Sequence, residues 1–161
     1  MNFRDAKAYT FFDTETTHLD ESRSAILQIA IVTDWAGGET ETWVQKIKPK
    51  DVEMKFAHPD ALKINRYNEE DWADAITFEE AAPIIAEKLK WGPVIAHNAP
   101  FDVKHVRAVM KRYGWTETWD LDKIGKGQKN YRIGYPIIDT VNLAYLFSPA
   151  EKQNLDALRE H

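Results

Sequence analysis

The chain has 161 residues, no cysteine and a formal net charge of −5. Hydrophobic residues make up 43% and charged residues 29%, which is typical of a globular domain and excludes a disordered or collagen-like chain. The lack of cysteine excludes disulfides, thiolate zinc sites and cysteine nucleophiles. No apolar run approaches the roughly 18 residues of a membrane span, and the N-terminus lacks the apolar core of a secretory signal. We therefore expect a single cytoplasmic domain over residues 1–161, with no membrane partner.

The first third of the chain predicts three strands. A short β-prone run over residues 9–12 ends near Asp13, and a longer apolar run covers residues 25–35. A turn signal, Ala36-Gly37-Gly38, separates this run from a third strand over residues 40–47. Strands joined by such short connections are expected to form an antiparallel meander.

The rest of the chain alternates between helices and strands. Thr77 and Glu80 have the spacing of a capping box at the start of a helix, and Gly114 is a stop signal at the end of the next one. Asp139 is placed to cap a later helix. The predicted helices cover residues 61–65, 77–90, 100–113, 139–147 and 155–161, and the predicted strands cover residues 94–96 and 136–138. This order predicts an α/β fold with a mixed central sheet, in which the three-strand meander is flanked by helices.

Polar clusters follow three of the predicted strands, at residues 13–17, 97–102 and 139–140. Sites in such sheets tend to form at the carboxyl ends of strands. Asp13 and Glu15 are two residues apart, so an extended chain directs both carboxylates to one face, where they repel each other unless a cation lies between them. The alternative is a solvated loop in which these residues cap something.

Asp102 lies on the apolar face of its predicted helix. One interpretation is that it satisfies free amides at the helix start. The other is that it delivers a third carboxylate inward, beside the first strand. A metal site built from carboxylates favours hard ions such as Mg²⁺ or Mn²⁺.

Two of these clusters resemble the motifs of a known family. Residues 11–17 (FFDTETT) and 97–102 (HNAPFD) resemble the first and second motifs of the DEDD superfamily of 3′→5′ exonucleases. Residues 138–140 (IDT) and 155–158 (LDAL) resemble the stretch before the third motif. The match is to the DnaQ-like, DEDDh branch, which includes polymerase proofreading subunits, RNase T and oligoribonucleases. It covers nearly the whole chain and implies a ribonuclease H-like fold.

The resemblance also implies an activity. The expected protein is a metal-dependent 3′→5′ exonuclease that removes nucleoside monophosphates from single-stranded ends, with DNA as the expected substrate and two divalent ions, Mg²⁺ or Mn²⁺, as cofactors. By matching positions, Asp13 and Glu15 would bind one metal, Asp13 would bridge to the second, and Asp102 would hold the second. These three are the expected catalytic residues. The alternatives are a non-catalytic nucleic-acid or protein-binding module on the same fold, or an RNA-specific trimmer.

Neighbouring residues suit a single-stranded 3′ end of DNA or RNA. Thr16 and Thr17 can offer amides and hydroxyls to the terminal sugar, and Asn98 can orient the second motif or contact the nucleotide. Leu19 and Phe101 are placed either to pack on the last bases or to pack in the core. A polymerase or another replication protein is a possible partner that the resemblance implies.

The stretch from Asp102 to Arg132 holds eight basic and four acidic residues, so it is basic within an acidic chain. It would either track phosphates, giving salt-sensitive binding, or form a solvated face. Its basic residues are Lys104, Arg107, Lys111, Arg112, Lys123, Lys126, Lys129 and Arg132.

The chain departs from the family pattern at three places, one of which is Gln28, where the family commonly has an acid in the second strand. His18 stands where the family usually has glycine, so it requires either an ordinary backbone or left-handed strain. The third motif, His-x-x-x-x-Asp, is not completed, and His161 comes too early to be the expected general base. The chain is then either a fragment or a naturally short variant, and we expect weak or absent activity together with exposed apolar sheet surface.

We expect structural roles for four further polar residues. We expect His97 to order the end of its strand, His58 to lie in a loop and His105 to be exposed on its helix. Asp139 is expected to cap a helix and not to act as the fourth carboxylate.

Overall fold

The computed structural model describes residues 5–120 and 127–148. No helix in these two ranges is long and apolar enough to cross a membrane. The elements in chain order are β1 (Ala8–Thr16), β2 (Ile26–Trp35), β3 (Thr40–Lys48), α1 (Asp51–Met54), α2 (Pro59–Ile64), β4 (Ile76–Thr77), α3 (Phe78–Leu89), β5 (Val94–Ala96), α4 (Ala99–Arg112), β6 (Thr116–Glu117), β7 (Asn130–Tyr131), β8 (Ile137–Asp139) and α5 (Thr140–Phe147).

A mixed six-stranded sheet forms the centre of the fold, in the order β4-β3-β2-β1-β5-β8. Strands β1, β2 and β3 pair antiparallel, whereas β5 runs parallel to β1 and β8 parallel to β5. This arrangement confirms the predicted mixed sheet with its three-strand meander. Strands β6 and β7 form a separate two-stranded sheet within the stretch after α4, where only a polar connection was expected.

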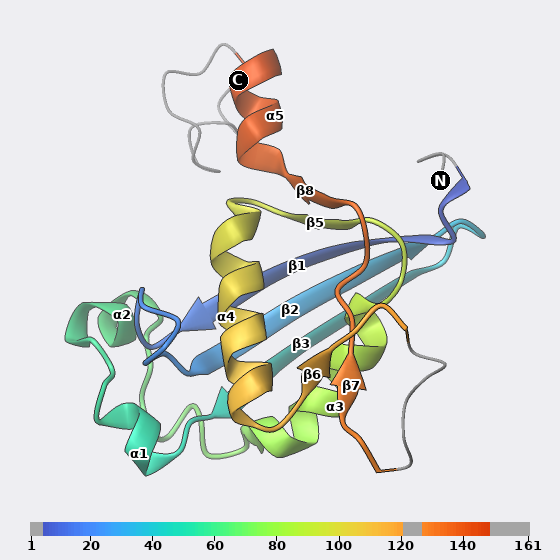
Figure 1. Cartoon of the computed structure of the whole chain (residues 1–161). Coiled ribbons are helices and arrows are strands. Elements are labelled where there is room, and N and C mark those ends of the chain that lie inside the picture. The colour runs from blue at the N-terminus through green and yellow to red at the C-terminus, as the bar shows by residue number, and fades with distance from the viewer. Residues whose placement is uncertain (1–4, 121–126, 149–161) are drawn as a thin grey trace.

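One face of the sheet carries the core. Phe12, Ile29 and Ile31 point to this face, where Phe78 and Ile85 of α3 and a row of α4 residues bury them. Figure 1 shows α4 running across the strands on this side. The row from α4 consists of Val103, Val106, Val109 and Met110.

The opposite face, which we call the open face, carries Phe11 and Asp13 of β1 and Val44 of β3. All three side chains are exposed. The alternation along β1 therefore separates an apolar core side from the side that bears the first predicted carboxylate. The expectation that the incomplete third motif leaves apolar sheet surface exposed, because a last helix is lacking, is not tested by these residues and stays a prediction.

The helix ends follow the signals in the sequence. Thr77 Oγ1 accepts a hydrogen bond from the Glu80 amide at 3.3 Å, and the Glu80 carboxylate accepts one from the Thr77 amide at 2.8 Å, which confirms the capping box of α3. Gly114 has a φ of +81° immediately after α4. This left-handed conformation is the one that favours glycine at a helix end, as expected.

Candidate active site

Asp102 meets β1 where that strand extends past its parallel neighbour. Strand β5 pairs with β1 only at Thr10 and Phe11, so it offers no partner to the amide of Thr14. The Asp102 carboxylate takes its place: Oδ1 accepts hydrogen bonds from the Thr14 amide at 2.9 Å and from the Thr14 hydroxyl at 2.7 Å. Asp102 is only 2% exposed. The helix therefore delivers this carboxylate inward beside the first strand, where it satisfies an amide of β1.

The turn between β5 and α4 fixes the position of Asp102. Asn98 adopts a left-handed conformation, with φ 64° and ψ 48°, which Asn tolerates better than most residues. The backbone N–H of Asn98 donates to Asp139 Oδ1 at 2.9 Å, and the same oxygen accepts a hydrogen bond from the backbone N–H of Val141 at 3.0 Å. The expected role of Asp139 as the cap of α5 is confirmed.

His97 Nδ1 lies 2.9 Å from Thr140 Oγ1 and so joins the end of β5 to the start of α5. This contact agrees with the expected role of His97 in ordering the strand end. Together with the Asn98–Asp139 hydrogen bond, it holds the second motif against the next β–α junction of the sheet.

The three predicted carboxylates influence one another electrostatically. Burial, and then the negative charge of Asp13, raise the pKa of Glu15 above its usual range. Burial raises the pKa of Asp102 to about 6; the hydrogen bonds from Thr14 oppose this rise and the charge of Asp13 adds to it. The charge of Asp13 thus contributes to the pKa shifts of both other acids. A cation near Asp13 would relieve this repulsion.

The chemistry of these donors fits a hard divalent cation, because Asp13, Glu15 and Asp102 offer only oxygen ligands. Within the described residues, however, no group of three His, Asp or Glu side chains lies close enough together to hold one ion. The assignment of these residues as shared metal ligands stays a prediction.

A hollow of about 390 Å³ lies beside Asp13. Its walls come from β1, β2, β5 and the start of α5, and most of them are apolar. It therefore places an apolar surface next to the first predicted carboxylate. The lining residues are Phe11, Phe12, Asp13, Ala30, Val32, Ile95, Ala96, His97 and Thr140.

The five residues predicted to contact substrate differ in exposure. Leu19 is 76% exposed and Asn98 is exposed, while Phe101 is half-buried. Thr16 and Thr17 are buried: the Thr16 hydroxyl donates to the His18 carbonyl at 3.2 Å, and Thr17 Oγ1 accepts from the Ala25 amide at 2.8 Å. In this structure the two hydroxyls close the β1–β2 loop, residues 17–25. Contacts of these five residues with a nucleotide stay predictions.

The prediction for His105 is wrong. The side chain is fully buried, because its position on α4 faces the β1–β2 loop and not solvent. The helical periodicity placed it beside the apolar stripe, and a histidine there was assumed to point outward. His58 is the N-cap of α2, where its Nδ1 accepts from the Asp60 amide.

His18 needs no left-handed strain. The described non-glycine residues with positive φ are Arg66 and Asn98, so His18 keeps an ordinary backbone. Its ring supports the turn, because Nδ1 accepts a hydrogen bond from the Asp20 amide at 2.8 Å. The His18 ring therefore stabilises this turn through a hydrogen bond, whereas a glycine would permit the turn through its conformational freedom.

Most of the basic side chains on α4 are already paired. Lys104 lies 3.2 Å from Glu21, Arg107 lies 2.8 Å from Glu117, and Arg112 lies 3.1 Å from Glu53. Lys111 is exposed on the same helix. Lys123 and Lys126 lie outside the described residues. These ion pairs favour the solvated-face interpretation for α4 over a phosphate track.

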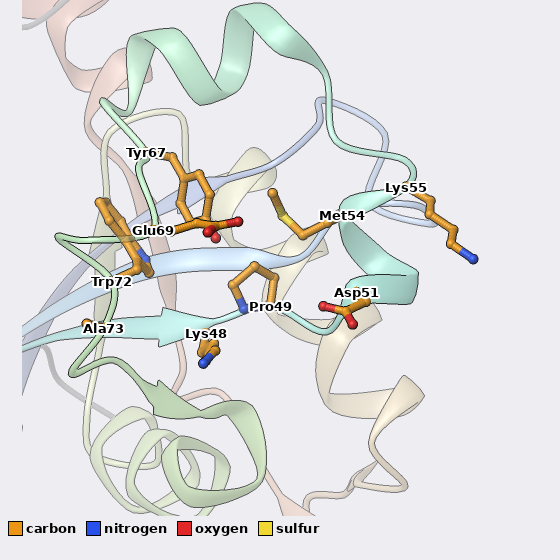
Figure 2. A pocket seen from close by; sticks show the side chains of 9 residues that line it. All are labelled: Lys48, Pro49, Asp51, Met54, Lys55, Tyr67, Glu69, Trp72 and Ala73. Carbon is orange, nitrogen blue, oxygen red and sulfur yellow. The ribbon is translucent and has the colours of Figure 1, made fainter.

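A second cavity, of about 750 Å³, lies away from these carboxylates, between the end of β3, α1 and the segment before β4 (Figure 2). At its back Trp72 donates to the Leu27 carbonyl at 3.1 Å and packs against Tyr67, which are structural contacts. Lys55 points away from the other side chains in Figure 2. The lining residues are Lys48, Pro49, Asp51, Met54, Lys55, Tyr67, Glu69, Trp72 and Ala73, none of which was predicted as a site residue.

The predictions on the third motif concern residues 149–161, including His161, and these lie outside the described residues. The structure therefore assigns neither a general base nor a fourth carboxylate. Sequence reasoning missed Thr14, the partner of Asp102. Its position between the two acids of the first motif was the one available signal.

Curated relatives with similar sequences carry the name DNA polymerase III. The DNA polymerase III subunit epsilon of Haemophilus influenzae is 26% identical over 155 residues, covering 91% of this chain and 53% of that protein. The DNA polymerase III PolC-type of Clostridium perfringens is 27% identical over 155 residues, covering 95% of this chain and 9% of that protein. The chain therefore spans about half, or much less, of the length of these relatives.

Solved structures of exonuclease I have the same fold. The ExoI/SSB-Ct complex aligns with a TM-score of 0.73 at 16% identity, covering 97% of this chain and 36% of that one. Escherichia coli exonuclease I in complex with a dT13 oligonucleotide aligns with a TM-score of 0.72, covering 96% of this chain and 35% of that one. The predicted ribonuclease H-like fold is confirmed.

The RNase_T family, described as exonuclease, matches residues 10–161, which is nearly the whole chain. This match includes both motifs on which the resemblance rested, and it supports a nuclease function. The chain thus belongs to the RNase_T exonuclease family, and its resemblance to the DnaQ-like exonucleases of the DEDD superfamily is confirmed.

Proposed function

We propose that this protein is a metal-dependent 3′→5′ exonuclease that removes nucleoside monophosphates from single-stranded DNA ends. The observation that carries the proposal is the contact of Asp102, on α4, with Thr14 of β1, which brings a third acid to the strand that bears Asp13 and Glu15. Burial raises the pKa values of both Glu15 and Asp102, and the charge of Asp13 adds to both shifts. Thr14 and Asp102, which make this contact, lie 88 positions apart in the chain. Such mutual repulsion is costly unless the site binds cations.

Asp13, Glu15 and Asp102 would hold the metal. Divalent ions bound there supply Lewis-acid activation of water and stabilise negative charge on the phosphate. The protein's own contribution is orientation: Thr14 fixes one oxygen of Asp102, which leaves the other oxygen for a ligand. Asp13 is exposed on the open face beside the apolar hollow, which supports a role for it in contacting a bound end through the metal.

Single-stranded DNA is the proposed substrate because the polymerase relatives carry DNA polymerase III names and exonuclease I is known in complex with dT13. Exposed Leu19 and half-buried Phe101 offer apolar surface on which a terminal base can pack without sequence readout. A replicative polymerase is the proposed partner, since the similar sequences belong to polymerase III proteins.

The test is to incubate the chain with 5′-labelled single-stranded DNA and with matched RNA in Mn²⁺. We expect a ladder that shortens from the 3′ end of the DNA. Asp13→Asn should lower the rate by at least about a hundredfold, more than outer-sphere changes typically cost. Asp34→Asn is the matched control, because Asp34 lies on β2 at the other end of the open face.

Three results would change the proposal. Cutting at internal positions would contradict exonuclease action. Shortening of RNA alone would identify an RNA-specific trimmer. Binding of the oligonucleotides without any shortening, in a chain shown to be folded, would mean either that the His and Asp of the incomplete third motif are essential or that the chain is a non-catalytic binding module. Mn²⁺ binding separates the two, because a binding module does not need a metal.

A further inference from the structure

His105 is held between two carbonyl oxygens. Its Nδ1 lies 2.8 Å from the Phe101 carbonyl, one turn earlier on α4, and its Nε2 lies 3.1 Å from the His18 carbonyl in the β1–β2 loop. A neutral imidazole has one N–H and can donate to only one of them, whereas the imidazolium donates to both. Because the side chain is fully buried, no solvent replaces a missing donor. The observed arrangement is complete only when both ring nitrogens carry protons.

The same side chain joins the two segments expected to face substrate. Its ring packs on that of Phe101, with 4.2 Å between the centroids, and its Nε2 holds the carbonyl immediately before Leu19. Lys104, the preceding residue, donates to the Leu19 carbonyl at 3.3 Å. Leu19 itself is largely exposed, so its position depends on these backbone contacts.

Resting on the proposed exonuclease function, we infer that His105 is a positioning residue that, as an imidazolium, fixes the β1–β2 loop against α4. In this state it sets Leu19 beside Phe101, so that the two present one surface to the terminal base.

Other groups near His105 also titrate. The elements around it carry Asp13 and Glu15 on β1, Asp20, Glu21 and His18 in the loop, His58 on α2, and Asp102 and Lys104 on α4. A change of pH alone therefore does not isolate His105, so the test combines direct observation of the ring with a variant that lacks its donors.

The first measurement needs neither metal nor substrate. ¹⁵N NMR of the metal-free chain at pH 6.5 should show a directly bonded proton on both ring nitrogens of His105. A spectrum of one neutral tautomer at this pH would overturn the inference.

The second measurement is amide hydrogen exchange in the same metal-free chain. His105→Phe keeps the ring packing but removes both donors. Exchange in residues 17–25 should become about tenfold faster, since one or two net hydrogen bonds are lost, while exchange in α3 stays unchanged and shows that the variant folds. His105→Gln, which keeps a donor, should restore part of the protection. His58→Asn is the matched control, because Asn also caps a helix. Equal loop exchange in wild type and His105→Phe would overturn the inference.

The third measurement separates positioning from a purely structural role. In the exonuclease assay, KM of His105→Phe for the oligonucleotide should rise about tenfold while kcat falls less than about threefold, because the carboxylates are untouched. A roughly tenfold fall in kcat with an unchanged KM would contradict the positioning role. If the wild-type chain has no activity, which is the outcome that an incomplete third motif predicts, no KM is obtained, and the ring protonation and the loop exchange alone decide whether His105 holds the loop.

Discussion

Thr14 controls the acidity of the most buried carboxylate of the site. Its hydroxyl and amide both donate to one oxygen of Asp102. Burial raises the pKa of Asp102 to about 6 even though these two hydrogen bonds oppose the rise. The folded pKa is above the unfolded value, so the folded state binds the proton more tightly. The associated stability is present at low pH and is lost as the pH rises from about 4 to about 6.

Thr14→Val should therefore destabilise the protein by a pH-dependent amount. The variant removes the hydroxyl donor with little change in shape, and the pKa of Asp102 should rise further. The free energy of unfolding should fall by about 2 kcal/mol at pH 8, where the Asp102 carboxylate is charged. It should fall by about 1 kcal/mol at pH 4.5, where that group is neutral. Urea denaturation at the two pH values measures both.

Thr10→Val is the matched control for this prediction. Thr10 is also a buried threonine of β1 and donates to the Trp91 carbonyl at 3.3 Å, away from the carboxylates. Its cost should not depend on pH between 4.5 and 8. The same cost for Thr14→Val at both pH values would show that Asp102 does not titrate in this range.

Single residues show which parts of the site the sequence could predict. Asp13, Glu15 and Asp102 could be proposed as site residues because their types and spacing suit the ends of strands and helices. The contacts that complete the site, Thr14 with Asp102 and His105 with the His18 carbonyl, join residues 88 and 87 positions apart. Only the packing of α4 on β1 determines such pairs, and no local pattern indicates them.

Among the elements, α4 does the most to hold the β1–β2 loop. Arg112, at its C-terminal end, donates to the Ser24 carbonyl at 2.8 Å and to the carbonyls of Glu21 and Ser22 at 3.2 Å. It also pairs at 3.1 Å with Glu53 of α1, which is only 7% exposed. One guanidinium thus ties the loop, α1 and α4 together.

Arg112→Met should destabilise the protein by about 2–3 kcal/mol, because Glu53 is left buried without its counter-charge. This value is below the usual cost of breaking a fully buried pair because the Arg112 side chain is 32% exposed. Adding Glu53→Gln should recover part of the loss. Lys111→Met, at the neighbouring exposed position, should stay within about 0.5 kcal/mol of wild type. Chemical denaturation of the four proteins tests this, and equal stabilities of Arg112→Met and Lys111→Met would contradict it.

The elements also differ in how well the sequence predicted them. The three long strands, α3 and α4 were predicted within about two residues at most ends, because each has a clear apolar period and a cap or turn signal. The two-residue strands β4, β6 and β7 and the four-residue α1 were missed. Elements this short have no period of their own, and they exist because a partner strand or an ion pair such as Arg112–Glu53 stabilises them.

At the scale of the whole molecule, the site links distant parts of the chain. Strand β1 supplies Asp13 and Glu15, α4 supplies Asp102, and β8 supplies the acceptor that fixes the turn before α4. The unfolded chain has no such arrangement of carboxylates, so a metal that binds them binds the folded state preferentially. Metal binding should then increase the free energy of unfolding of the whole domain.

Mn²⁺ should raise the midpoint of thermal unfolding at pH 7.5. At a free concentration one hundred times the Kd, the gain is about 2.7 kcal/mol, which corresponds to roughly 5–10 °C for a domain of this size. The gain should largely disappear at pH 5, because the pKa of Asp102 is about 6 and that of Glu15 is also raised, so that protons compete with the metal. Scanning calorimetry with and without Mn²⁺ at each pH gives the comparison.

Two variants assign this effect to the site. Asp13→Asn should lose most of the Mn²⁺-dependent gain, because Asp13 is the acid whose charge acts on both of the others. The same variant should be at least as stable as wild type without metal, since removing that charge relieves the repulsion. Asp34→Asn should respond to Mn²⁺ as wild type does. A gain that persists in Asp13→Asn, or one that is as large at pH 5 as at pH 7.5, would place the bound ion away from these carboxylates and would remove the electrostatic basis of the proposed function.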